Sequence, residues 1–118
     1  MLTLPPSIQV FLCLEPADMR KGIDGLSALT KNKLAGDPLS GHLFCFFNKR
    51  SDKVKVLYWD RGGFCLFHKR LEKGRFHWEA FKGHKEPGAA PLRFPELILI
   101  LEGIDLQNAK RHKRFALS

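Results

Sequence analysis

Basic side chains are the residues of this sequence whose number and spacing suggest chemistry. The 118-residue chain has 20 Lys and Arg against 12 Asp and Glu, which gives a formal net charge of +8. The excess is concentrated in residues 49–85, where eleven basic residues accompany four acidic ones. Such a surface attracts polyanions, so nucleic acid, an acidic protein or anionic lipid are the candidate partners.

The candidate contacts to a phosphate backbone fall into three groups. The first lies at the start of a predicted helix, the second in predicted turns and strand ends, and the third in a tail that lacks acidic residues. They are Arg20 and Lys21; Lys49, Arg50, Arg61, Lys69, Arg70, Lys73 and Arg75; and Lys110, Arg111, Lys113 and Arg114. Distributed cations suit the spaced charges of nucleic acid. Ordinary solvated surface cations are the alternative interpretation for each of them.

Arg20 and Lys21 are the most specific of these candidates. If Asp18 caps a helix, both fall in its first turn, beside backbone N–H groups that have no partner within the helix. Cations at that position predict an anion site, and a DNA phosphate is a reasonable ligand. The alternative is a pair between Arg20 and Asp24, four residues apart, that only stabilises the surface.

Aromatic residues accompany the cations of the central segment. Phe76, His77 and Trp78 could stack on exposed bases. The alternative is that Trp59, Phe67 and Trp78 belong to the core of a sheet whose other face is solvated.

Other kinds of site have weaker support. The carboxylates mostly occupy cap, turn or terminal positions, whereas a metal-dependent nuclease needs several that converge. The five histidines show no spacing typical of metal ligands. Cys13, Cys45 and Cys65 are odd in number and widely spaced, and we expect buried, reduced thiols. We therefore predict no catalytic residue, no metal site and no cofactor.

The hydrophobic segments argue against a membrane protein. The apolar runs at residues 10–14 and 97–101 are far too short to span a bilayer. The first ten residues carry no basic side chain and contain Pro5 and Pro6, so they do not resemble a signal peptide. We expect a cytoplasmic protein.

The hydrophobic pattern predicts an α+β fold. We expect an antiparallel sheet meander of about five strands, one helix after the first strand and a short C-terminal helix, with the helices on one face. The predicted strands cover residues 8–14, 42–48, 53–59, 64–71 and 75–78; the helices cover 18–34 and 95–102, and 80–91 is a loop. Residues 1–105 form a single domain, and residues 106–118 are a basic tail, predicted to be disordered until it meets a partner.

Five linked motifs suggest a family. They are DMRKGIDGL (residues 18–26), DPLSGHLF (37–44), LYWDRGGFCL (57–66), KRLEKGRF (69–76) and LEGID (101–105). In this order the chain closely resembles the TnpB accessory protein of the insertion-sequence-66 (IS66) family. The resemblance implies a product encoded beside a separate, larger transposase that carries the acidic catalytic residues, and it transfers no catalytic residue to this chain.

Three functions follow as hypotheses. The first is a non-catalytic accessory protein of transposition that binds the DNA of insertion-sequence ends through its basic surface. The second is an interaction module that docks on the transposase of the same element. A metal-dependent nuclease is the third and has the least support.

Overall fold

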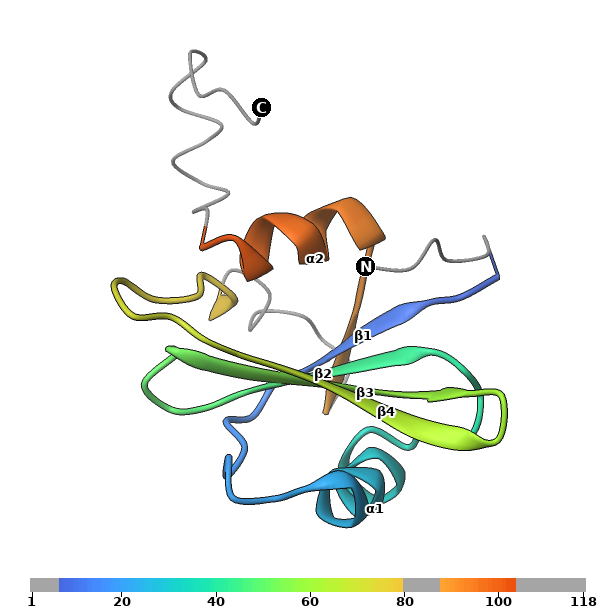
Figure 1. The fold of residues 1–118 in the computed structure, drawn as a ribbon. Helices are drawn as coiled ribbons and strands as arrows, with labels where there is room; N and C mark the ends of the chain where they lie inside the picture. The colour runs from blue at the N-terminus through green and yellow to red at the C-terminus, as the bar shows by residue number, and fades with distance from the viewer. Residues whose placement is uncertain (1–6, 80–87, 104–118) are drawn as a thin grey trace.

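The computed structural model describes residues 7–79 and 88–103 and has an α+β fold, as predicted. Five strands form one sheet in the order β4-β3-β2-β1-β5, and two helices pack on it (Figure 1). The elements are β1 (Val10–Cys13), α1 (Ile23–Lys33), β2 (Leu43–Phe47), β3 (Lys53–Asp60), β4 (Gly63–Arg70), β5 (Ala89–Leu92) and α2 (Phe94–Leu101).

Strands β2, β3 and β4 form the predicted antiparallel meander. The β3–β4 hairpin closes at the pair Asp60 and Gly63, so its loop has two residues. Both, Arg61 and Gly62, have positive φ, as the tightest hairpin turns require. The turn between β2 and β3 is longer and lies at the opposite end of β3.

The prediction of an entirely antiparallel sheet is wrong at β1 and β2. These strands are parallel, with Val10 beside Leu43 and Leu12 beside Cys45. Parallel neighbours cannot be joined by a hairpin and need a crossover connection, which α1 supplies here. The sheet is therefore mixed, with one parallel pair.

The fifth strand lies elsewhere than predicted. Residues 75–78 are not a strand, and β5 instead comes from the segment predicted as a loop. It pairs antiparallel with β1 and places Pro91 opposite Phe11. Proline has no N–H to donate, and an edge strand tolerates it because one of its sides needs no partner.

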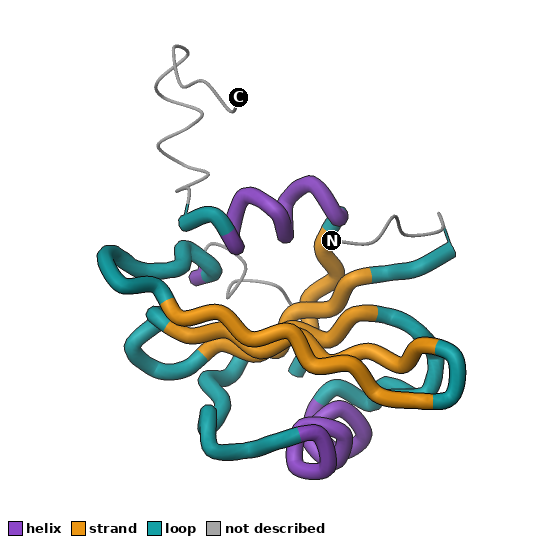
Figure 2. Tube along the Cα trace, in the orientation of Figure 1, coloured by secondary structure: helices purple, strands orange, loops and turns teal. Residues whose placement is uncertain are grey.

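The two helices cover opposite faces of the sheet, so the prediction that both lie on one face is wrong (Figure 2). On the α2 face, Leu97 and Ile100 pack with Val54 and Val56. On the α1 face, Leu26 packs with residues of β2 and β3 such as Phe44 and Leu57. All five residues of β2 are buried, which is the pattern of a strand covered on both sides.

Helix α1 begins later than predicted. Its first residue is Ile23, its N-cap is Gly22, and no side chain bonds to the cap position. Asp18 is therefore not a helix cap, and residues 17–21 form a loop across the sheet. Helix α2 begins and ends within one residue of the prediction.

Candidate nucleic-acid interface

Two connections meet beside the ends of β2 and β3. One is the segment of residues 17–21 between β1 and α1, named here the 17–21 loop. The other is the segment of residues 48–52 between β2 and β3, named the 48–52 turn. The backbone N–H of Ala17 donates to the carbonyl of Phe47 over 2.8 Å, which ties the loop to the residue before the turn.

The 48–52 turn is organised by the side chain of Asn48. Its Oδ1 accepts from the backbone N–H groups of Asp52 and Lys53, each at 3.0 Å, and its Nδ2 donates to Asp52 Oδ1 at 2.6 Å. This last bond is the main reason that the pKa of Asp52 is below its usual value. Lys49 and Arg50 lie exposed at the tip, held there by a fixed backbone.

Ser51 joins this turn to the segment of residues 75–78. Its buried hydroxyl accepts from Trp78 Nε1 at 2.9 Å, and its carbonyl accepts from the N–H of Phe76. Phe76 and Trp78 are buried, and Trp78 stacks on Phe47 with ring centroids 5.4 Å apart. The prediction that Phe76 and Trp78 stack on exposed bases is therefore wrong, and the alternative that Trp78 belongs to the core is confirmed. His77, the third candidate for stacking, is half-buried.

Two aromatic residues outside that segment differ from the core interpretation. Phe67, which that interpretation placed in the core, is 37% exposed, and Trp59 is only half-buried. Trp59 contacts Phe64 edge to face, with centroids 5.1 Å apart.

The 17–21 loop is held by Lys55, a residue absent from the predicted site. This lysine is only 8% exposed, and its Nζ donates to the carbonyls of Met19 at 2.8 Å and Lys21 at 2.9 Å. Alternation along β3 places it on the same face as Lys53, which made it look like a solvated cation. Its ammonium instead fixes the backbone on both sides of Arg20.

Asp18 and Arg20 pair with each other inside the loop. The guanidinium donates to both carboxylate oxygens, with Nη2 2.7 Å from Oδ2, and the Arg20 backbone N–H donates to Oδ1 at 2.9 Å. Side-chain hydrogen bonds from Arg20 lower the pKa of Asp18 to about 2. Neither the helix-start anion site nor the pair with Asp24 is present, because the helix begins three residues after Arg20.

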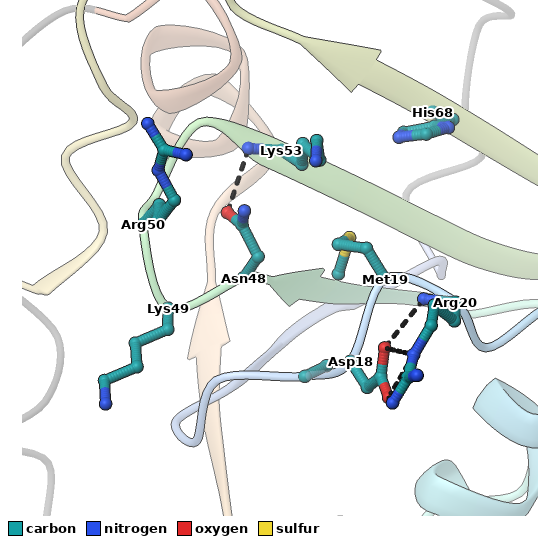
Figure 3. A pocket seen from close by; sticks show the side chains of 9 residues that line it. Asp18, Met19, Arg20, Asn48, Lys49, Arg50, Lys53 and His68 are labelled. Carbon is teal, nitrogen blue, oxygen red and sulfur yellow. Dashed lines mark hydrogen bonds and ion pairs between the residues drawn. The ribbon is translucent and has the colours of Figure 1, made fainter.

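A pocket of about 490 Å³ lies between the loop, the turn and the sheet (Figure 3). Its charged members are four cations and one carboxylate, and His68 of β4 completes the wall. The lining residues are Ala17, Asp18, Met19, Arg20, Asn48, Lys49, Arg50, Lys53 and His68. Of the carboxylates in the described part of the chain, none forms an ion pair with Lys49, Arg50 or Lys53.

The other predicted cations are distributed over the molecule. Lys69 points to the opposite face, where its Nζ donates to the Leu101 carbonyl at the end of α2, at 2.8 Å. Arg61 lies in the β3–β4 turn, at the far end of β3 from the pocket. Two arginines form ion pairs, Arg70 with Glu72 and Arg75 with Glu79. Each of these arginines therefore has a carboxylate partner in the fold.

Two other predicted cations do not line the pocket. Lys21 and Lys73 are exposed. Lys110, Arg111, Lys113 and Arg114 lie outside the described residues. Within residues 7–79 and 88–103, no three His, Cys, Asp or Glu side chains are grouped as a metal site would need. No helix in these residues has the length and apolar character to cross a membrane.

Comparisons with known proteins place the chain in a family. Residues 8–111 match the family described as IS66 Orf2 like protein. Two proteins of Sinorhizobium fredii (strain NBRC 101917 / NGR234), uncharacterized proteins y4jC and y4hO, are each 35% identical to this chain. The first match covers 88% of this chain and 86% of y4jC, and the second covers 89% and 88%. No solved structure matches the chain significantly. The chain therefore belongs to the IS66 Orf2-like family, as the five motifs predicted.

Proposed function

We propose that this chain is a non-catalytic accessory protein of insertion-sequence transposition that acts in the cytoplasm and binds DNA through the pocket between the 17–21 loop and the 48–52 turn. Family membership supports the accessory role. The observation that carries the binding proposal is the gathering of Arg20, Lys49, Arg50 and Lys53 around one pocket with a single carboxylate, Asp18.

The charge of this pocket is available to a ligand. Asp18 and Arg20 neutralise each other, so this pair neither strongly attracts nor strongly repels an incoming anion. Lys49, Arg50 and Lys53 form no ion pair with a described carboxylate, although Arg50 and Lys53 lie close enough to Asp52 to help lower its pKa. A DNA backbone that runs along the pocket would replace counterions at these cations, and release of counterions drives salt-dependent, weakly sequence-selective binding.

The proposal is tested by fluorescence anisotropy with a labelled duplex of an insertion-sequence end, titrated at increasing salt. Lys49→Ala with Arg50→Ala should weaken binding at low salt and reduce the slope of log K against log salt by about 2, because each lost phosphate contact contributes about 0.9. Both side chains are exposed at a turn that Asn48 holds, so the fold should persist.

A control variant that loses the same charge elsewhere separates the effect of the pocket from that of the protein's net charge. Lys31→Ala with Arg61→Asn also removes two cations. Lys31 is an exposed residue of α1, and Arg61 lies in the far hairpin turn, where asparagine tolerates positive φ. This variant should keep most of the affinity. Equal losses in the two variants would refute the pocket as the binding site, and salt-insensitive binding by the native chain would refute the electrostatic mechanism.

The second candidate function is docking on the transposase, and strand β4 favours it. In the described sheet β4 is one of the two edge strands, the other being β5. The outer N–H and C=O groups of β4 can therefore pair with an added strand. Phe67 on this strand is one of the exposed large hydrophobic residues.

Co-purification with the transposase in the presence of nuclease tests this second function. A complex held by β4 should survive nuclease treatment and be lost in Phe67→Lys. A complex that nuclease dissolves is bridged by DNA and contradicts docking through the strand.

A further inference from the structure

His68 is the one titratable side chain of the pocket that ordinarily changes charge near neutral pH. It is exposed on β4, and in the β3–β4 register it stands directly opposite Lys55. Lys53 and Arg70 form the next pair on the same face, two residues along each strand. Arg70 also forms an ion pair with Glu72. The imidazole therefore lies beside Lys55, Lys53 and an arginine that is partly neutralised.

The other elements around His68 add mostly positive charge. Arg20 and Asp18 reach the pocket from the 17–21 loop, and Lys49 and Arg50 reach it from the 48–52 turn, which also carries Asp52. Helix α1 covers the same face of the sheet; its first-turn acidic residue is Asp24, and Lys31 and Lys33 lie in its last turn.

We propose that a phosphate group of the DNA backbone binds in this pocket and that His68 takes up a proton when it does. The proposal rests on the proposed function and adds a proton to the binding step. In the free protein the neighbouring cations oppose an imidazolium. A phosphate among them reverses that field and accepts hydrogen bonds, and both nitrogens of a charged imidazole are donors.

The direction of the pH dependence follows from this exchange. Desolvation, and then Lys55, Lys53 and Arg70, lower the pKa of His68 in the free protein from its ordinary 6.5. Bound phosphate raises that pKa. Affinity should therefore increase as the pH falls through the pKa of the complex and become constant below the pKa of the free protein. The total gain is about tenfold for each unit by which binding raises the pKa.

The experiment measures the affinity of a short DNA duplex without terminal phosphates between about pH 5 and pH 8, where phosphodiesters do not titrate but histidine does. Ionic strength is held constant. In parallel, NMR follows the His68 ring protons through the same pH range, with and without the duplex. We expect tighter binding at low pH and a His68 midpoint that DNA moves upward.

Matched histidine variants identify the group responsible. His68→Gln keeps a polar side chain of similar reach and should remove most of the pH dependence. His77→Gln changes a half-buried histidine outside the pocket and should leave it intact. The proposal is overturned if the His68 midpoint is unmoved by DNA or if His68→Gln retains the full pH dependence. Salt-dependent binding without pH dependence would refute this inference alone, whereas no binding at low salt would also refute the proposed function.

Discussion

At the scale of single residues, the sequence identified cations but not their roles. Lys53 and Lys55 share a strand face and look alike in the sequence, yet Lys53 lines the pocket and Lys55 is buried under the 17–21 loop. The difference depends on which segment crosses the strand, and that segment is distant in sequence. Lys69 is a similar case, because its ammonium donates to the Leu101 carbonyl at the C-terminal end of α2, where a cation is favourable.

Replacement of Lys55 tests its role in holding the loop. Lys55→Met keeps the length and apolar stem but leaves the carbonyls of Met19 and Lys21 without their donor. We expect a loss of about 1–3 kcal/mol in the free energy of unfolding, measured by urea denaturation, together with weaker DNA binding. Lys53→Met removes the same charge from the pocket wall and should change stability by less than about 0.5 kcal/mol. Equal stability losses in both variants would contradict the assignment.

At the scale of elements, hydrophobic pattern and turn residues located most strands but not their pairing. The apolar runs and the turn residues between them predict the meander of β2, β3 and β4 and its turn at Arg61 and Gly62, and the structure agrees. The parallel pair β1 and β2 could have been predicted, because a strand followed by a helix and another strand commonly forms a crossover unit. The position of β5 could not have been predicted, because Ala89, Ala90 and Pro91 have little preference for strands. Their pairing with β1 makes them a strand.

The segment of residues 75–78 shows why a local pattern was misleading. Its aromatic residues alternate as in a strand, but its backbone and indole bond to Ser51 of the 48–52 turn instead of a neighbouring strand. The candidate site was affected in the same way. The sequence shows which residues are cationic, but the position of the 17–21 loop depends on contacts with Lys55, more than 30 residues away.

The backbone of the 48–52 turn yields a prediction about Ser51, whose φ is +60°. Ser51→Ala and Ser51→Gly both remove the hydroxyl that accepts from Trp78, but only glycine adopts positive φ without steric cost. The glycine variant should therefore be more stable than the alanine variant by about 1 kcal/mol in the free energy of unfolding. Both should be less stable than the native chain. An alanine variant at least as stable as the glycine variant would show that backbone strain does not matter here.

At the scale of the whole molecule, the sheet is the middle of three layers. The sequence predicted a sheet with one well-covered face, because alternating Lys53 and Lys55 suggested a solvated side. Instead the α1 face carries its own apolar cluster, and the cations of the pocket lie at the end of that face nearest the 48–52 turn. The basic pocket thus lies at one end of a sheet buried on both sides, which gives it a rigid floor.

The layered architecture predicts that single truncations on either face are costly. Leu26 of α1 and Leu97 of α2 are both fully buried, on opposite sides of the sheet. Leu26→Ala and Leu97→Ala should each lower the free energy of unfolding by about 2–5 kcal/mol, from lost burial and the cavity left behind. Leu39→Ala is the control, because Leu39 is 55% exposed, and it should cost less than about 0.5 kcal/mol.

The two core variants also test whether the layers are independent. The sheet separates the two sites, so their effects should add, and a domain stable by only about 5–15 kcal/mol should then be largely unfolded in the double variant. Urea denaturation monitored by circular dichroism measures all four variants. If either helix did not pack on the sheet, its core variant would cost little, because its leucine would lie in solvent. A near-zero effect of either single core substitution would therefore disprove the three-layer arrangement, and with it the rigid floor on which the basic pocket depends.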